Sequence, residues 1–260
     1  MTAPILTTFL EPVQDIVTIP KTIPEDLETQ LSQDYGRLEG ATSICIYNFE
    51  GSNVAADAIS AYVYSNSKLQ VHTIVDKSVP EWIGPDVDVI IMSYSGSNRY
   101  LESIYGGLKF KGSRIHCITS GGKLAELCKT NGDRLHLVPG GLSTFEATGF
   151  EMGALINLYD SLGVEGLKDA IIEMIPRLKK YRDEIWGSRY VWKLAMKVNG
   201  AIPVIYSSGE LRAVHKRWKF LLNDVTEKLA FSGEIPEFDH NEIVSWTEDS
   251  DAKEFIILII

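Results

Sequence analysis

Apolar and polar residues alternate in short blocks along the first half of this chain. Five β-rich runs predict strands, and helical stretches or polar loops lie between several of them. Strands that alternate with helices indicate an α/β fold, in which a parallel sheet is covered by helices on both faces. The predicted strands are Thr42–Asn48, Leu69–Val75, Val87–Met92, Arg114–Thr119 and Arg134–Val138, and the helical stretches are Val54–Tyr64, Arg99–Leu108 and Lys123–Lys129.

The rest of the chain predicts a long helical region followed by another α/β unit. Helical sequence extends from about Thr144 to Leu162 and again from Leu167 to Trp186, with interruptions at Gly163 and Pro176. The expected domains are residues 1–150 and residues 151–260, and the domain at residues 151–260 is expected to be incomplete at its carboxyl end. The elements expected after the helices are the strand Ile202–Tyr206, the helix Glu210–Leu222, an extended piece at Ile235–Phe238 and the apolar strand Phe255–Ile260.

Loops of small polar residues follow three of the predicted strands. They are Glu50-Gly51-Ser52-Asn53, Ser93-Tyr94-Ser95-Gly96-Ser97-Asn98 and Thr119-Ser120-Gly121-Gly122. In open α/β sheets, ligands bind at the carboxyl ends of the strands. The hydroxyl and backbone N–H groups of the loop at Ser93–Asn98 suit a phosphate dianion at the start of a helix, although Ser and Asn are also favoured in simple capping turns. The pattern therefore predicts a binding edge.

Composition and charge limit the classes of molecule that this protein is expected to bind. The net charge of −10 argues against a general nucleic-acid surface, so a phosphorylated ligand would need a locally positive site. No apolar run reaches the ~20 residues that span a bilayer, and no secretion signal opens the chain, so we expect a cytoplasmic protein without a membrane partner. The 3 cysteines have no ligand spacing and favour buried, reduced thiols. No cluster of residues suggests a metal site.

One carboxylate and one histidine form a candidate acid–base pair. Asp224 ends the stretch Arg217-Trp218-Lys219-Phe220-Leu221-Leu222-Asn223-Asp224, and the stretch His240-Asn241-Glu242-Ile243 begins sixteen residues after Asp224. This region resembles the bifunctional phosphoglucose/phosphomannose isomerases, which show R-W-K-x-x-L-N-E and then H-N-E-I-V-x-W at the same separation. The chain has Asp224 where the family has its glutamate base.

The resemblance extends over most of the chain. The loop beginning at Ser93 resembles the family's S-Y-S-G-N-T phosphate loop, with Asn98 in place of threonine and Arg99-Tyr100 in place of two glutamates. Thr119–Lys123 matches without change, and its expected role is structural.

Other family positions differ. Gly51-Ser52 matches the end of the G-x-G-G-S loop, but Asn48 and Glu50 replace two of its glycines. Phe145 stands where the family has an arginine that stabilises the enediolate. Losing that cation would cost ~10²–10³ in rate by analogy with oxyanion-hole deletions.

The resemblance implies two sugar isomerase (SIS) units and an aldose–ketose isomerase that acts on glucose 6-phosphate or mannose 6-phosphate. It implies Asp224 as the base and His240 as the group that assists ring opening across a homodimer interface, with neither cofactor nor metal. Substrate-binding residues would be Gly51, Ser52, Ser93, Ser95, Asn98, Arg99 and Arg217.

Three alternatives remain open from the sequence. The chain is an isomerase of the family's substrates, an isomerase of another phosphosugar, or a catalytically impaired protein that binds a sugar phosphate in a regulatory role. Asp224 also fits a solvated helix end, His240 a structural histidine and Arg217 a salt-bridged helix face.

Overall fold

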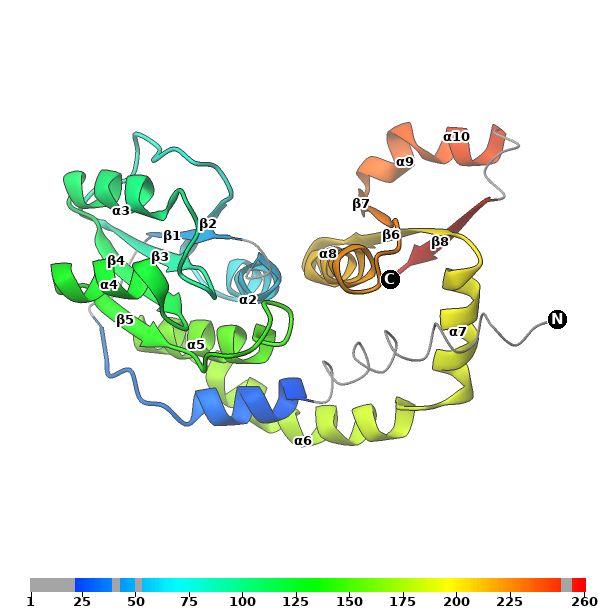
Figure 1. Cartoon of the computed structure of the whole chain (residues 1–260), viewed down its shortest axis with the longest axis horizontal. Coiled ribbons are helices and arrows are strands. Elements are labelled where there is room, and N and C mark those ends of the chain that lie inside the picture. The colour runs from blue at the N-terminus through cyan, green and yellow to red at the C-terminus, as the bar shows by residue number, and fades with distance from the viewer. Residues whose placement is uncertain (1–21, 39–42, 50–52, 249–253) are drawn as a thin grey trace. The chain divides into compact units, whose positions relative to one another are not determined.

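The computed structural model describes residues 22–38, 43–49, 53–248 and 254–260 (Figure 1). These residues form two compact units, Thr22–Ile175 and Pro176–Ile260. The division lies beyond residue 150, because helix α5 (Thr148–Ser161) packs almost wholly inside the core of the first unit. Residues 151–175 therefore belong structurally with the first unit.

The first unit is built on a parallel sheet of 5 strands, in the order β2-β1-β3-β4-β5. The central strands are apolar along most of their length, as expected for strands buried on both faces. The α/β fold and the parallel sheet expected from the sequence are thus confirmed. The strands are β1 (Ser43–Asn48), β2 (Gln70–Ile74), β3 (Val87–Met92), β4 (Arg114–Thr119) and β5 (Arg134–Leu137).

Helices cover both faces of this sheet (Figure 1). Alternate residues of β1 show the division, because Ile44 and Ile46 pack with α2 and α5, whereas Cys45 and Tyr47 pack with α3 and α4. A helix over residues 22–31, which the sequence did not predict, adds Leu27 to the core formed with α2 and α5. The other covering helices are α2 (Asn53–Asn66), α3 (Leu101–Phe110) and α4 (Gly122–Asn131).

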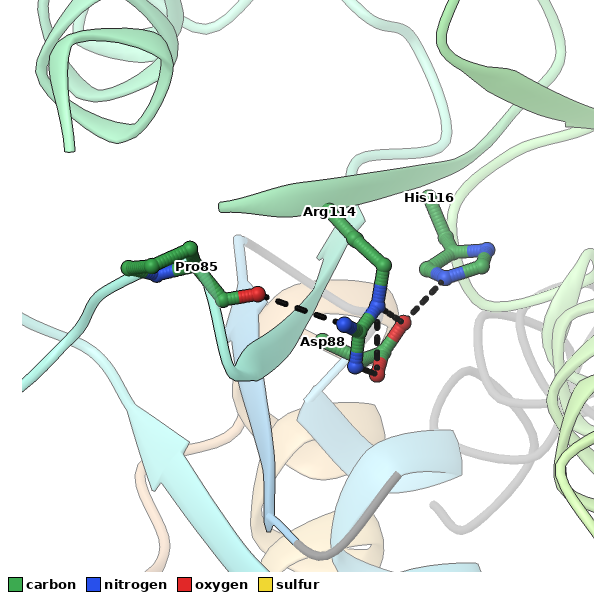
Figure 2. A network of polar contacts seen from close by, with 4 residues as sticks. All are labelled: Pro85, Asp88, Arg114 and His116. Atoms are coloured by element: carbon green, nitrogen blue, oxygen red, sulfur yellow. Dashed lines mark hydrogen bonds and ion pairs between the residues drawn. The ribbon is translucent and has the colours of Figure 1, made fainter. Parts of the chain in front are cut away.

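A buried ion-pair network joins β3 and β4 near the amino-terminal end of the sheet. Asp88 is the second residue of β3, and its carboxylate accepts hydrogen bonds from Arg114 and from His116 of β4 (Figure 2). The His116 Nε2–Asp88 Oδ1 distance is 2.9 Å, and Arg114 Nη1 also donates to the Pro85 carbonyl at 3.2 Å. Burial alone raises the pKa of Asp88, but the hydrogen bonds from His116 and Arg114 hold it below its usual value.

The second unit contains a parallel sheet of 3 strands with β6 in the centre, in the order β7-β6-β8. Its first helix, α6 (Leu167–Ile185), begins in the first unit and contains Pro176, where the units divide. No described helix is both long and apolar enough to cross a membrane. The remaining elements are α7 (Arg189–Asn199), β6 (Ile202–Ser208), the 3-10 turn η2 (Gly209–Leu211), α8 (Arg212–Phe220), the π-helical turn η3 (Leu221–Val225), β7 (Phe231–Ile235), α9 (Glu237–Asn241), α10 (Ile243–Glu248) and β8 (Phe255–Ile259).

The prediction of an extended segment at Ile235–Phe238 was wrong in its position. The strand is β7, which ends at Ile235, and α9 begins two residues later. Gly233 lies in the middle of β7, and an interior glycine is atypical of a strand. A Cβ on Gly233 would lie 2.7 Å from the Tyr206 ring, so glycine stands there because the aromatic ring of β6 packs against the strand.

Candidate functional site

Three loops meet at the carboxyl ends of β3, β4 and β5. Tyr94, in the loop after β3, is buried and connects all three. Its hydroxyl donates to the Pro139 carbonyl at 3.0 Å and accepts from the Leu142 N–H at 2.8 Å. Its own carbonyl accepts from the N–H of Ser120 at 2.9 Å and from the Ser120 hydroxyl at 2.7 Å. The loops that follow these strands are therefore held together as one structure.

Two glycines allow the loops after β3 and β4 to touch. Gly96 has φ +63°, and a Cβ there would lie 2.0 Å from the Gly121 carbonyl oxygen. Gly122 has φ +65°, and a Cβ there would lie 2.3 Å from the Ser95 carbonyl oxygen. Both positions combine a left-handed backbone with a close approach, so only glycine fits. The Leu124 N–H of α4 donates to the Gly96 carbonyl at 2.9 Å and completes the contact.

The predicted phosphate-binding residues share the Ser93–Asn98 loop but differ in environment. Ser93 is fully buried, and its hydroxyl has no hydrogen-bond partner among the described residues. Ser95 is exposed, and its hydroxyl accepts from the Ser97 N–H at 3.3 Å. The Asn98 side chain accepts from the Tyr100 N–H at 3.0 Å. Because α3 begins at Leu101, the loop is longer than the sequence suggested before its helix starts.

Two cations flank the aromatic ring that follows this loop. Arg99 lies 4.7 Å from the centre of the Tyr100 ring, and Lys77 Nζ lies 4.4 Å from it. Hydrogen bonding with Lys77, together with Arg99, lowers the pKa of the Tyr100 phenol. Lys77 comes from the connection between β2 and β3, and its contribution could not be found from sequence spacing. The pair supplies positive charge beside the loop in a chain with a net charge of −10.

The loop after β1 is only partly described. Gly51 and Ser52, both predicted to bind substrate, and Glu50 lie outside the described residues. Asn48, at the last position of β1, is described and is 3% exposed. Both polar atoms of its side chain are buried without a partner among the described residues.

The predicted base, Asp224, lies in the second unit, in the π-helical turn η3 that follows α8. Its side chain is exposed. The preceding Asn223 fixes this turn, because its amide donates to the Ala230 carbonyl at 3.1 Å and accepts from the Ala230 N–H at 2.8 Å. The backbone of Asp224 is thereby held while its carboxylate faces solvent.

The predicted histidine, His240, is exposed on α9. No hydrogen bond or ion pair within the described residues joins its imidazole to the Asp224 carboxylate. The same H-N-E stretch is anchored by Glu242, which accepts from the Tyr206 hydroxyl. Trp246 Nε1–H donates to that hydroxyl at 3.2 Å, so β6 positions both α9 and α10. Burial, reinforced by Glu242, raises the pKa of Tyr206 to about 12.

Helix α8 carries Arg217 and the buried His215. Arg217 is partly buried in the last turn of the helix. His215 is 2% exposed, and its Nδ1 lies 2.7 Å from the Ser207 oxygen, whose proton is donated to the Leu211 carbonyl at 2.9 Å. This bond ties α8 to the end of β6, so His215 has a structural contact.

Phe145 occupies the turn before α5, and its carbonyl accepts from the Thr148 hydroxyl at 3.0 Å. The backbone of this position therefore serves the start of the helix, whichever side chain it bears. Within the described ranges, no group of three or more His, Cys, Asp or Glu residues is placed to hold a metal ion.

Known proteins resemble both the sequence and the fold. Residues 189–260 match the family of the bacterial phospho-glucose isomerase C-terminal SIS domain. A bifunctional phosphoglucose/phosphomannose isomerase of Caldicellulosiruptor bescii is 29% identical over 80% of this chain and 63% of its own length. One of Aquifex aeolicus is 29% identical over 72% of this chain and 56% of its own. The chain thus spans less than two thirds of these relatives.

The fold comparison agrees. A solved structure from Silicibacter pomeroyi DSS-3, described as a phosphosugar isomerase, superposes with a TM-score of 0.71. The aligned region covers 94% of this chain and 76% of the solved chain, at 16% sequence identity. The resemblance seen in the motifs is therefore confirmed: this chain is similar to the bifunctional phosphoglucose/phosphomannose isomerases, and its fold is that of the solved phosphosugar isomerase structure.

Proposed function

We propose that this protein is a phosphosugar aldose–ketose isomerase that interconverts glucose 6-phosphate or mannose 6-phosphate with fructose 6-phosphate. The observation that carries the proposal is the set of three cross-linked loops at the carboxyl edge of the first sheet, joined through Tyr94. The names of the relatives supply the substrate class.

The Ser93–Asn98 loop would hold the phosphate. Ser93 and Ser95 bring hydroxyl donors, and Asn98 fixes the chain that leads into α3. Arg99 and Lys77 add the positive charge that a dianion needs on an acidic protein. Gly51 and Ser52 would complete the contact from the neighbouring strand.

Asp224 would move the proton. Its carboxylate takes the proton from C2 of the open-chain aldose, the C1–C2 enediol forms, and the same carboxyl group returns the proton to C1. The O2 proton leaves as the ketone forms at C2, and O1 gains a proton. The net change is one proton from C2 to C1 and one from O2 to O1, so no cofactor or metal is required.

His240 would assist ring opening at the ring oxygen and O1. Its exposure on α9 suits a contribution to the site of a second copy of the chain, so a homodimer is part of the proposal. Glu242 and Tyr206 would hold the histidine in place through α9. Arg217, in α8 and seven residues before Asp224, would meet the sugar or orient the base.

A second candidate is a protein that binds a sugar phosphate without turning it over. The observation that favours it is Phe145, which puts a neutral side chain where the family has a cation for the enediolate. Asp224 is also shorter than the glutamate of the family by one methylene, or about 1.5 Å.

Exchange of the C2 proton of glucose 6-phosphate with deuterated water separates the two candidates. The wild type should exchange this proton, and Asp224→Asn should lose the activity by about 10²–10⁴-fold, because an amide cannot accept it. Glu227→Gln is the matched control, since Glu227 is exposed and lies only three residues further along. It should exchange at the wild-type rate.

Asp224→Glu should retain or raise the rate. Wild-type binding of the sugar phosphate without exchange would support the second candidate. In that case Asp224→Glu combined with Phe145→Arg tests whether the longer base and the missing cation restore turnover. Exchange that is indifferent to Asp224→Asn would rule out Asp224 as the base.

A further inference from the structure

Asn48 ends β1 beside the start of the Ser93–Asn98 loop. It pairs with Met92 in the parallel register of β1 and β3, and the Phe49 N–H donates to the Met92 carbonyl at 3.1 Å. Ser93 is the next residue after Met92. Asn48 and Ser93 therefore lie at the ends of two adjacent strands, at the carboxyl edge of the sheet.

Both side chains are buried without a partner. The Oδ1 and Nδ2 atoms of Asn48 and the Oγ atom of Ser93 have no hydrogen bond within the part of the chain that the structure describes. Asn48 is 3% exposed and Ser93 0%. Buried polar groups are almost always hydrogen-bonded, because an unpaired group loses its bonds to water and gains none. Two such side chains on neighbouring strand ends point to a partner that binds from outside the chain.

The two side chains differ in the number of atoms left without a partner: Asn48 has a separate donor and acceptor to satisfy, whereas Ser93 has a single hydroxyl that can turn its proton to an acceptor. An asparagine amide both donates and accepts, as does a sugar hydroxyl, whereas a phosphate dianion only accepts. We propose that Asn48 binds a hydroxyl group of the phosphorylated sugar, while the Ser93 hydroxyl donates to the phosphate. The family pattern has glycine at the position of Asn48, so this contact is particular to this chain.

The proposal rests on the proposed function, and it adds a consequence of its own. Asn48 would distinguish a sugar phosphate from inorganic phosphate. The unpartnered amide also predicts that removing it does not weaken the ligand-free protein. Asn157 provides the control, because it is 2% exposed and its Nδ2 donates to the Gln30 carbonyl at 2.7 Å, while its Oδ1 alone has no partner among the described residues.

Calorimetric titration with fructose 6-phosphate, glucose 6-phosphate and inorganic phosphate tests the assignment. Asn48→Ala should bind both sugar phosphates about tenfold more weakly and inorganic phosphate as the wild type does. Ser93→Ala should weaken all three. In thermal unfolding without ligand, Asn48→Ala should keep the wild-type Tm, whereas Asn157→Ala should lower it. Asn48→Gly, which places the residue of the family pattern, should repeat the selectivity of Asn48→Ala.

Three results would overturn the inference. One is unchanged sugar-phosphate affinity in both Asn48 variants, and another is a lower Tm in Asn48→Ala with unchanged affinity. The third is equal weakening for the sugar phosphates and inorganic phosphate, because it would move the contact to the phosphate. A wild-type protein that binds no sugar phosphate would instead refute the proposed function itself, so the two failures are distinguishable.

Discussion

Two buried polar side chains at opposite ends of the first sheet, Asp88 and Asn48, differ in how they are bonded. At the amino-terminal end, the Asp88 carboxylate is bonded by Arg114 and His116. At the carboxyl end, the polar atoms of Asn48 and Ser93 are buried without a partner in the described residues. The completed network at Asp88 stabilises the unit, whereas the unpartnered groups of Asn48 and Ser93 are the ones that we infer to bind a ligand.

Other buried polar atoms of the first sheet also lack a partner among the described residues, namely Ser113 Oγ just before β4, His116 Nδ1 and His136 Nε2. His136 aligns with Ile118 of β4, so it lies toward the carboxyl end of the sheet. In a neutral imidazole one nitrogen is a bare acceptor. If His116 donates through Nε2 to Asp88, its Nδ1 is an acceptor and lacks only a donor. Asn48 differs from the two histidines because both a donor and an acceptor of its side chain are unpartnered.

The largest expected effect follows from Asp88→Ala. Removing the carboxylate should lower the free energy of unfolding by about 3 kcal/mol, the low end for breaking a buried pair, because the Arg114 side chain is 46% exposed and can turn to water. The measurement is urea unfolding. Glu81→Ala is the control, since Glu81 is 99% exposed in its ion pair with Lys111 and should change stability by less than about 1 kcal/mol. Sugar-phosphate affinity at the carboxyl end should not change in either variant.

The strands of the first sheet and the loops that follow them could be predicted from the sequence. The run Val87–Met92 and its neighbours predict strands because they are apolar and β-branched, and the small residues after them predict loops. The network at Asp88 could not be predicted, because it joins residues 26 and 28 positions apart through strand register. Lys77 and Tyr100 likewise meet only through the fold.

The candidate site of the second unit was predictable only as a set of residues. The sequence placed Asp224 at a helix end and His240 at a helix, and both positions agree with η3 and α9. It could not show that Glu242 bonds to Tyr206, because the two residues lie 36 positions apart. The chemical roles of Asp224 and His240 remain predictions.

The next prediction tests the close contact of the loops at the carboxyl end. Gly96→Ala would place a Cβ 2.0 Å from a backbone oxygen, so the loops must separate and phosphate binding should fall at least tenfold. Gly132→Ala is the control, because Gly132 has φ +68° but open space around it. The control should lose only the ~1–2 kcal/mol of the left-handed backbone and should bind phosphate normally. Equal binding in the two variants would show that the contact between the loops is dispensable.

A third prediction concerns the pH dependence of stability that arises from His136 of β5, whose register partner is Ile118 of β4. Burial, helped by His116 and Arg134, lowers the pKa of His136 from 6.5 to about 3. Between these values only the unfolded chain binds the proton, so stability should fall as pH falls, by up to roughly 1.4 kcal/mol per pH unit. Asp26, whose pKa burial raises to about 6, acts in the opposite direction.

The difference between wild type and His136→Gln cancels the Asp26 contribution, because both proteins contain Asp26. Urea unfolding at several values between pH 4 and pH 7 should give a steeper loss of stability for the wild type. Parallel pH profiles would show that His136 is protonated in the folded protein.

The smallest expected effect is electrostatic and lies at the rim of the carboxyl end. Arg99→Glu restores a family residue and reverses a charge 4.7 Å from the Tyr100 ring. Because the side chain is exposed, sugar-phosphate affinity should fall only about two- to fivefold, and added salt should reduce the difference. Lys77→Ala should act in the same direction, whereas Lys129→Ala, on the last turn of α4, should have no effect. A loss that persists at high salt would place Arg99 in direct contact with the phosphate and move the boundary of the site outward from Ser93 to the start of α3.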